Sequence, residues 1–290
     1  MELSVIIVSF NVRDYLKQCL CSIEAGLSNI DNEIFVVDNN SEDGSAEMIR
    51  SEFPGIKLIV NKVNAGFSTA NNQAIKQSQG RFVLLLNPDT IVEKDTFSRC
   101  IDFMNNHTDA GALGIRMING DGRFLPESKR AFPTPLTAFF KSFGFSFLFP
   151  KSRVVNRYYL PQNDSQETSL TEVISGAFMF IRREALCRSG LLDEDYFMYG
   201  EDIDLSYRLF QTGFKNYYVP GIQIVHFKGR STRRNNFRDI RYFYKAMRIY
   251  VMKRHGDGVC NPLHLLIIPV IYFREGLALG NRILRLTFKK

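Results

Sequence analysis

The sequence predicts an α/β fold in which a mixed, mainly parallel sheet is flanked by helices and followed by a basic helical tail. The first observation is a series of short, wholly apolar runs, which are typical of strands buried on both faces. The second is that helical patterns separate these runs, as they do between parallel strands. The third is ordinary globular usage, with 45% hydrophobic and 23% charged residues among 290.

Strands and helices alternate over the first 100 residues. The predicted strands are Ser4–Val8, Ile34–Val37, Ile56–Val60 and Phe82–Leu86. The predicted helices are Asp14–Ile23, Ser45–Phe53 and Ser68–Gln77. Gly80 follows the last of them, where a glycine commonly ends a helix. Because ligands bind beyond the carboxyl ends of parallel strands, the segments that follow these strands are the first candidates for a site.

The second half of the chain is less regular. Residues 119–122, Asn-Gly-Asp-Gly, are a turn signal that predicts a hairpin. Residues 126–170 are rich in proline and aromatic side chains and predict long loops. Regular structure is expected again at Val173–Arg182, then as a helix over about Glu201–Gln211, and then as strands around Tyr217–Val219 and Ile222–Phe227.

Composition and motifs exclude several classes of protein. The five cysteines include no CxxC pair, which argues against a disulfide framework and favours a reducing compartment. We find no signal-peptide pattern and no uninterrupted apolar stretch of about 18 residues, so no spanning helix is expected. The chain lacks GxGxxG, GxxxxGK[ST] and GxSxG, which disfavours Rossmann dehydrogenases, P-loop NTPases and nucleophile-elbow hydrolases.

The net charge of +7 is concentrated in the tail. Residues 1–100 hold 9 Lys/Arg and 13 Asp/Glu, and residues 101–227 hold 13 and 14. Residues 228–290 hold 15 Lys/Arg and only 3 Asp/Glu. A basic tail behind a slightly acidic body indicates a separate task, such as contact with a nucleic acid or an anionic membrane surface.

Polar residues follow the predicted strands at the ligand-binding edge. They lie in Ser9-Phe10-Asn11, Asp38-Asn39-Asn40, Asn61–Phe67 and Asn87-Pro88-Asp89. The Asp38 carboxylate can accept hydrogen bonds from a base imide or a ribose hydroxyl. The alternative for Asp38 is a polar turn into the next helix.

Two further positions could hold a divalent cation. Asp89 follows a wholly apolar strand, and carboxylate oxygen is a preferred ligand of Mg²⁺ and Mn²⁺ bound to diphosphates. The alternative is that Asp89 caps the following helix. His226 ends another apolar run and is either structural or a second metal ligand. The histidines show no HxxxH or HExxH spacing, so zinc is not expected.

The densest acidic segment is Gly200-Glu201-Asp202-Ile203-Asp204, which follows an aromatic stretch. A carboxylate at the mouth of an aromatic pocket is a suitable general base. The alternative is an acidic first helical turn favoured by the helix dipole, with Asp204 and Arg208 as a surface pair.

In their order and spacing these segments resemble the family 2 glycosyltransferases, inverting enzymes with the GT-A fold. The likeness runs from Ser4 to Ser231. It is carried by residues 4–11 (SVIIVSFN), 36–41 (VVDNNS), 64–72 (NAGFSTANN), 86–89 (LNPD), 175–178 (SGAF) and 200–205 (GEDIDL). Within the family, the NPD motif, FMYGEDIDL and the HFKG ending at residues 226–229 look most like bacterial polysaccharide rhamnosyltransferases.

The resemblance implies a role for each matching residue. Ser9, Phe10, Asn11 and Asp38 would bind the nucleotide, with Phe10 stacked on the pyrimidine and Asp38 hydrogen-bonded to it. Asn64 and Gly66 would contact the nucleotide, and Gly176 and Ala177 would border the donor sugar. Asp89 would hold the cation with His226, while Asn87 replaces the first acid of the family's DxD motif. Asp202 would be the general base, with Glu201 as the second candidate.

The implied reaction is metal-dependent transfer of a sugar, rhamnose as the first choice, with inversion. The donor would be a UDP- or dTDP-sugar, the cation Mg²⁺ or Mn²⁺, and the acceptor a glycan or a polyprenyl-diphosphate-linked glycan. Residues 1–228 would be the catalytic domain, divided into a nucleotide-binding half (1–105) and an acceptor and catalytic half (106–228). The alternatives are a nucleotidyltransferase and a non-catalytic nucleotide-sugar-binding protein.

The tail, residues 229–290, interleaves basic and aromatic residues and then contains a short apolar run. This pattern favours an anchor on an anionic membrane surface, which places the protein in the cytoplasm, peripheral on the inner face of the cell membrane. The alternative is a helix packed on the body, at the interface of a homodimer. Nucleic acid is not expected as a partner, because no known nucleic-acid-binding motif accompanies the charge.

Overall fold

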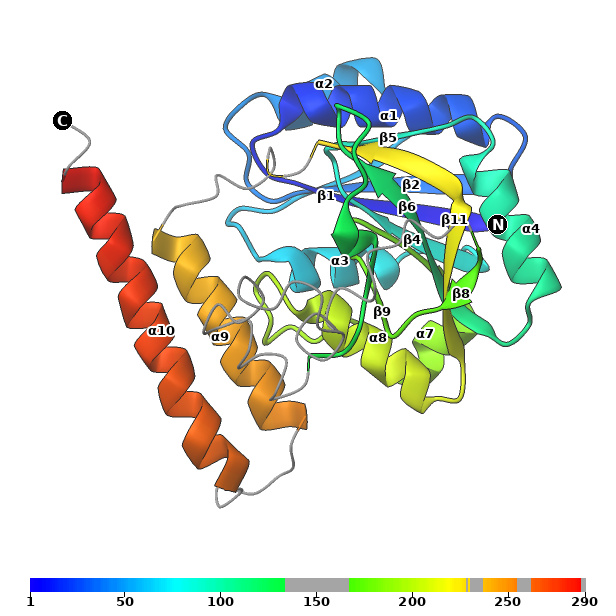
Figure 1. The fold of residues 1–290 in the computed structure, drawn as a ribbon. Coiled ribbons are helices and arrows are strands. Elements are labelled where there is room, and N and C mark those ends of the chain that lie inside the picture. Colours follow the sequence, from blue (N-terminus) through cyan, green and yellow to red (C-terminus); the bar gives the residue numbers. More distant parts are fainter. Residues whose placement is uncertain (134–166, 228, 230–236, 255–261, 288–290) are drawn as a thin grey trace.

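The computed structural model describes the chain except for residues 134–166, 228, 230–236, 255–261 and 288–290 (Figure 1). Its helices are α1 (Arg13–Leu27), α2 (Ser45–Glu52), α3 (Phe67–Ile75), α4 (Thr96–Asn106), α7 (Arg183–Ser189), α8 (Glu201–Gln211), α9 (Phe237–Arg254) and α10 (Pro262–Thr287), with a 3-10 turn at Pro126–Ser128. Its strands are β1 (Leu3–Ser9), β2 (Asn32–Asp38), β3 (Lys57–Val60), β4 (Phe82–Leu86), β5 (Thr90–Val92), β6 (Ala110–Ile118), β7 (Lys129–Arg130), β8 (Ser169–Leu170), β9 (Val173–Ile174), β10 (Phe178–Arg182) and β11 (Lys215–His226).

Most strands form one nine-stranded sheet in the order β3-β2-β1-β4-β10-β6-β11-β5, with β8 paired to β11 (Figure 1). β1 is parallel to β2 and β4, and β2 is parallel to β3. β10 runs antiparallel between β4 and β6, while β11 is parallel to β6 and antiparallel to β5. The expected mixed, mainly parallel sheet is confirmed.

Both faces of the sheet are buried under helices, which explains why its strands are continuously apolar. Successive strand residues point to opposite faces, so Val5 and Ile7 join one core cluster and Ile6 joins the other. The first cluster includes Leu16 and Leu20 of α1 and Phe97 of α4. The second includes Ala70 and Ala74 of α3 and Leu205 and Leu209 of α8.

Two sequence-based expectations differ from the structure. The predicted hairpin at residues 119–122 is reduced to one antiparallel bridge between Ile118 and Phe124. The two strands predicted near residue 220 form one long strand, β11, whose register to β6 shifts between Val219 and Gln223. The shift includes Pro220 and Gly221, the two residues that separate the predicted strands. Most of the loop predicted over residues 126–170 lies outside the described residues.

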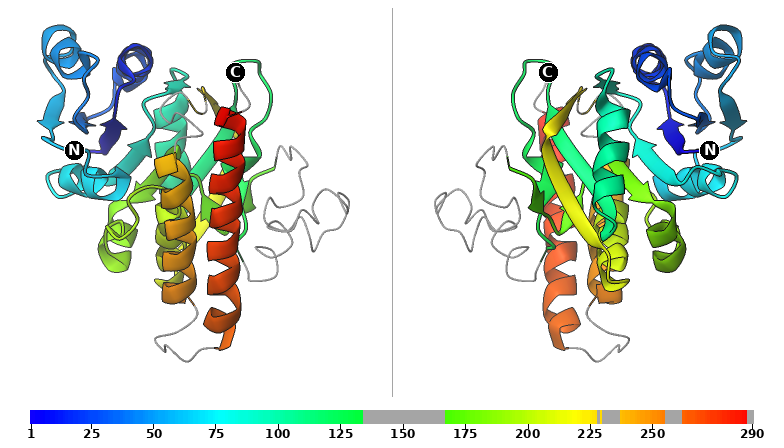
Figure 2. Two further views of the ribbon diagram at one scale, coloured as in Figure 1. Left: turned by 90° about the vertical axis from the view of Figure 1, so that its left-hand side faces the viewer. Right: turned by 90° about the vertical axis from the view of Figure 1, so that its right-hand side faces the viewer.

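The basic tail is helical, as expected, and α9 packs on the body. Figure 1 shows α10 outermost, with α9 between it and the body, and Figure 2 shows the two helices side by side. Arg248 of α9 pairs with Glu275 of α10 at 2.5 Å. Lys253 of α9 pairs with Asp195 of the body at 2.7 Å. None of the described helices is both long and apolar enough to cross a membrane.

Candidate active site

The carboxyl ends of β1 and β2 form the first part of the site. Asp38 is the last residue of β2 and is 1% exposed. Its Oδ1 accepts a hydrogen bond from the Ser41 amide at 2.9 Å, but its buried Oδ2 has no hydrogen-bond partner among the described residues. The hydroxyl of Ser9, the last residue of β1, is likewise buried without one in the described part of the chain. Buried polar atoms of this kind need a partner, and a bound ligand can supply it.

Phe10 and Asn11 follow Ser9 and differ in what they can contribute. The Phe10 ring is 40% exposed and is free to stack on a planar ligand. Asn11 instead joins two loops: its amide donates to Ser41 Oγ at 3.0 Å, and its Oδ1 accepts from the Glu42 amide at 2.8 Å. Asn11 therefore connects the loop after β1 to the loop after β2.

Asn39, for which no separate role was predicted, connects this edge to the loop before α3. It is buried, and its side-chain amide donates to the Gly66 carbonyl at 3.1 Å. Its Oδ1 accepts from Asn61 Nδ2 at 2.9 Å. In the same loop, Asn64 Oδ1 accepts from the Gly66 amide at 3.0 Å. Asn64 therefore shapes the loop through its side-chain oxygen.

Gly66 sits where no larger residue fits. Its φ is +86°, and a Cβ would lie 2.6 Å from the Phe197 carbonyl oxygen. The same oxygen accepts a hydrogen bond from the Phe67 amide at 2.7 Å. The close approach brings the aromatic stretch before α8 against the loop expected to bind a nucleotide.

Asp89 and His226 meet at this edge, although they lie far apart in the sequence. β5 begins just after Asp89 and pairs with the end of β11, so that Thr90 lies opposite His226. The His226 Nε2 lies 3.3 Å from Asp89 Oδ1, and the Phe227 amide donates to the Asp89 carbonyl at 2.9 Å. Both side chains are buried.

This pair fits a cation that also binds a diphosphate. Among the described residues, no group of three or more His, Cys, Asp or Glu side chains is placed to hold a metal ion alone. Mg²⁺ and Mn²⁺, however, are commonly held by one or two protein ligands and by substrate phosphates. One carboxylate and one imidazole are sufficient for that arrangement.

The loop 175–178 is hydrogen-bonded to Asn87, two residues before Asp89. The Asn87 amide donates to the Ala177 carbonyl at 3.0 Å, and β4 pairs with β10 directly beyond it. Asn87 uses its own carbonyl to accept from the Thr90 hydroxyl at 2.8 Å. The backbone of Asn87 thus fixes the loop that contains Gly176.

Asp202, at the start of α8, contacts the same loop through Gly176. The Gly176 amide donates to its Oδ2 at 3.1 Å, and the Ile203 amide donates to its Oδ1 at 2.8 Å. Arg130 of β7 forms an ion pair with the same Oδ2, and the two side chains are only 12% and 13% exposed. Arg130 was not predicted, because no motif links it to Asp202 across 72 residues.

Glu201 is buried beside Asp202. Burial raises the pKa of the Glu201 carboxyl to about 8, and the negative charge of Asp202 adds to the effect. A carboxyl with this pKa holds its proton at neutral pH and cannot accept another. Of the two neighbouring acids, Asp202 is therefore better suited to remove a proton.

We expect Glu201→Gln to reduce the dependence of stability on pH. The Glu201 carboxyl has an ordinary pKa of 4.5, so in the unfolded chain it ionises well below the folded value of about 8. The folded state therefore loses stability as the pH rises between these two values. Gln cannot ionise, so the melting temperature of the variant, relative to wild type, should increase from about pH 5 to about pH 8. A difference that does not change with pH would contradict the raised pKa.

Asp204 and Arg208 are not the surface pair that the sequence suggested. Arg208 pairs with Asp204 Oδ2 at 2.8 Å, and the side chains are 26% and 13% exposed. They line a cavity of about 210 Å³ between α8 and α9. Because α9 covers this face of α8, burial raises the pKa of Asp204.

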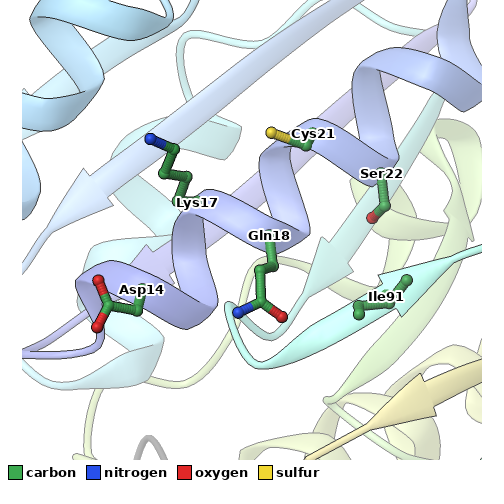
Figure 3. A pocket seen from close by; sticks show the side chains of 6 residues that line it. All are labelled: Asp14, Lys17, Gln18, Cys21, Ser22 and Ile91. Carbon is green, nitrogen blue, oxygen red and sulfur yellow. The ribbon is translucent and has the colours of Figure 1, made fainter.

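A shallow pocket on α1 is separate from these residues. Figure 3 shows it between α1 and β5, lined by Asp14, Lys17, Gln18, Cys21, Ser22 and Ile91. None of the expected site residues lines it, and its side chains suggest no chemistry.

Comparison with known proteins identifies relatives over most of the chain. Residues 4–188 match the family model "Glycosyl transferase family 2". The N-acetylglucosaminyl-diphospho-decaprenol L-rhamnosyltransferase of Mycobacterium tuberculosis is 26% identical over 299 residues, covering 99% of this chain and 96% of the relative. Rhamnosyltransferase WbbL of Escherichia coli is 26% identical over 260 residues, covering 86% and 92%.

Solved structures share the fold at lower identity. The mannosyltransferase PcManGT from Pyrobaculum calidifontis, in complex with GDP-Man and Mn²⁺, has a TM-score of 0.58 and 18% identity, covering 99% of this chain and 74% of that chain. S. aureus TarS 1–349 in complex with UDP-GlcNAc has a TM-score of 0.56 and 20% identity, covering 87% and 66%.

Proposed function

This chain belongs to glycosyl transferase family 2, and we propose that it transfers rhamnose from a UDP- or dTDP-sugar to a hydroxyl of a glycan acceptor. The observation that carries the proposal is the convergence of four groups on one sheet edge. They are the Asp38 Oδ2, which has no hydrogen-bond partner in the described part of the chain, the Asp89–His226 pair, the Gly176 loop and the Asp202 carboxylate. The choice of rhamnose is supported by the names of the two relatives.

The donor would lie along the ends of β1, β2 and β4. Phe10 would stack on the base, and Asp38 Oδ2 would accept a hydrogen bond from the base or ribose. Ser9 would offer its buried hydroxyl, and the Gly66 backbone would approach the nucleotide closely, as a residue without a Cβ can. Gly176 and Ala177 would border the sugar, between the metal pair and Asp202.

Asp89 and His226 would hold a divalent cation at the diphosphate. When bound, Mg²⁺ or Mn²⁺ supplies positive charge that stabilises the departing nucleoside diphosphate. One structural neighbour was solved with Mn²⁺. Both protein ligands are buried at the end of paired strands, so they need little reorganisation to bind an ion.

Asp202 would act as the general base. The acceptor oxygen forms a bond to the anomeric carbon as that carbon's bond to the diphosphate breaks, and the hydroxyl proton passes to Asp202. A carboxylate has about four lone-pair positions, and among the described residues three donors occupy Asp202, from Gly176, Ile203 and Arg130. One position is therefore left for the acceptor hydroxyl. A single displacement with one base inverts the anomeric centre.

The acceptor and the cellular site are the remaining parts of the proposal. One relative is named for a decaprenol-diphosphate-linked acceptor, which supports a polyprenyl-diphosphate-linked glycan as the acceptor here. We propose that the enzyme works on the inner face of the cell membrane as a peripheral protein. Homodimer formation is the alternative for the same basic tail, and vesicle flotation separates the two.

A donor screen tests the proposed function. The melting temperature is measured with UDP- and dTDP-sugars, each with Mg²⁺, with Mn²⁺ and with a chelator, because a bound donor stabilises the fold by mass action. We expect a metal-dependent increase with one pyrimidine nucleotide sugar, and no increase in Asp38→Ala. If no nucleotide sugar raises the melting temperature under any of these conditions, the proposal is wrong.

A further inference from the structure

The outer face of α10 carries a solvent-exposed apolar stripe. Its members form three adjacent pairs that are seven and then eleven residues apart, about two and three helical turns, which places them on one side of the helix. Their exposed fractions range from 54% to 69%, which is high for large apolar side chains in a folded protein. They are Leu265, Leu266, Tyr272, Phe273, Ile283 and Leu284.

The opposite side of α10 is attached to α9, which fixes the direction of the stripe. Ile271 is 3% exposed, and Glu275 pairs with Arg248 of α9 at 2.5 Å. Since α9 lies between α10 and the body, the stripe points away from the body (Figure 1). The stripe therefore does not contribute to the core that holds the fold together.

The charge of the tail that contains the stripe indicates what covers the stripe. Residues 228–290 hold 15 Lys/Arg and 3 Asp/Glu, and exposed basic residues occur on both helices, such as Arg241 and Lys245 on α9 and Arg285 on α10. A second copy would bring two such surfaces together and oppose like charges. An anionic lipid surface attracts the same residues.

We propose that α10 lies in the plane of an anionic membrane surface, with its apolar stripe in the boundary between headgroups and acyl chains. Arg274 and Arg285 lie on α10 outside the stripe, where their long side chains can reach the headgroups. This inference rests on the proposed function in one respect: it names the surface through which the enzyme would meet a lipid-linked acceptor. Vesicle binding needs no donor, so either proposal can fail alone.

Vesicle flotation of the full chain tests the inference. Phe273→Glu places a charge within the stripe, and Asn281→Glu places the same charge at an exposed position of α10 outside it. Phosphatidylcholine vesicles with and without phosphatidylglycerol are the probes. We expect wild type to float with the anionic vesicles and less so at high salt. Phe273→Glu should bind about 10-fold or more weakly, and Asn281→Glu should lose much less.

Three results would overturn it. One is equal flotation of Phe273→Glu and wild type, and another is equal binding to neutral and anionic vesicles. The third is a wild-type dimer without lipid that Phe273→Glu converts to a monomer, which would assign the stripe to a second copy. The melting temperature of each variant tests whether it folds. We expect wild-type values, because neither position contributes to the core.

A different observation concerns α9 and the donor loop. The ring of Tyr242 on α9 stacks on Phe197, with centroids 4.2 Å apart and planes 18° apart. The Phe197 carbonyl oxygen accepts a hydrogen bond from the Phe67 amide. The same oxygen is the atom that a Cβ on Gly66 would meet. We infer that Tyr242 is a positioning residue: it holds Phe197, and through it the Gly66 loop, in the form that binds the donor.

Kinetics of three variants test this role, which depends on the proposed function. Tyr242→Ala removes the stack, Tyr242→Phe keeps it, and Tyr244→Ala makes the same truncation nearby on α9. We expect Tyr242→Ala to raise the KM for the donor and the Kd for the nucleoside diphosphate about 2- to 10-fold with little change in kcat. Tyr242→Phe and Tyr244→Ala should behave as wild type.

A fall in kcat at unchanged KM, or equal damage by Tyr242→Phe, would contradict the inference. Asp38→Ala separates this failure from failure of the proposed function. If Asp38→Ala binds the nucleoside diphosphate as wild type does, the proposed donor site itself is wrong. If Asp38→Ala binds weakly and Tyr242→Ala normally, only the positioning role is wrong.

Discussion

Asp89→Ala should remove the metal dependence of nucleoside diphosphate binding and reduce turnover by about 10²–10³-fold or more. Asp89 is the one carboxylate of the proposed cation site, and it is buried against His226 at the end of two paired strands. Without it, the imidazole alone holds the cation poorly, and the charge on the departing diphosphate is left unbalanced. Calorimetry of UDP and dTDP binding, with and without Mn²⁺, measures the first effect directly.

The control for Asp89→Ala is Asp95→Ala. Asp95 is an exposed aspartate near α4 that pairs with Arg99 on the surface. It should leave metal-dependent affinity, turnover and melting temperature nearly unchanged. If Asp89→Ala retained Mn²⁺-dependent affinity for the nucleoside diphosphate, the cation would have to be held elsewhere, and the donor pose proposed above would be lost with it.

Asp202→Asn should keep donor and metal affinity while losing about 10²–10⁴-fold in turnover. The amide has almost the shape of the carboxylate but cannot accept a proton at neutral pH. It can still receive the Gly176 amide through its oxygen, so the loop bordering the donor sugar should stay in place. Single-turnover kinetics at saturating donor isolates the chemical step from product release.

Glu201→Gln is the matched control for Asp202→Asn, because it makes the same chemical change at the adjacent residue. The raised pKa of Glu201 means that the wild-type side chain already holds its proton at neutral pH. The uncharged Gln side chain of the variant should therefore retain most activity. Asp202→Asn also leaves Arg130 without its ionic partner, so its melting temperature must be measured alongside. If Asp202→Asn stayed active while Glu201→Gln lost activity, the two roles would have to be exchanged.

The first half of the fold could be predicted because its elements obey local rules. The predicted strand Phe82–Leu86 has the observed bounds, and the predicted helix at Ser45 begins at the observed residue. β5 was not predicted, and α4 entered only through the alternative that Asp89 caps a following helix, which is wrong because β5 follows Asp89 and Asp95 precedes α4. β5 is only three residues long and exists through its pairing with the end of β11, a contact that no local pattern encodes.

The tail could be predicted as helical and basic, but its position could not. The charge change near residue 228 suggested a segment apart from the body. In the structure α9 contacts the body through Tyr242, Lys253 and Arg254, whose guanidinium lies 3.1 Å from the centroid of the Tyr207 ring. Partners that lie more than 40 residues away leave no trace in local composition, so only the three-dimensional fold reveals them.

The candidate site shows the same division. Asp38, Asp89 and Asp202 stand at strand ends or a helix start, where sequence motifs mark them. Asn39 and Arg130 were missed because their roles depend on hydrogen bonds to Gly66 and an ion pair to Asp202 formed across the fold. Asn39 could have been found from the sequence, because it directly follows Asp38 at the same edge. A side-chain amide at that position can form hydrogen bonds to two loops at once.

Identification of the phosphate product tests the central claim most directly, which is that this sheet edge transfers a sugar from a nucleotide diphosphate. The enzyme is incubated with Mn²⁺, the donor selected by the melting screen and a polyprenyl-diphosphate-linked glycan. The released phosphate compound is then quantified against the glycosylated acceptor. We predict one nucleoside diphosphate for each sugar transferred, and almost none from Asp202→Asn in a single turnover. Release of pyrophosphate would instead indicate a nucleotidyltransferase, and binding without any product would indicate a nucleotide-sugar-binding protein, so either result would contradict the claim.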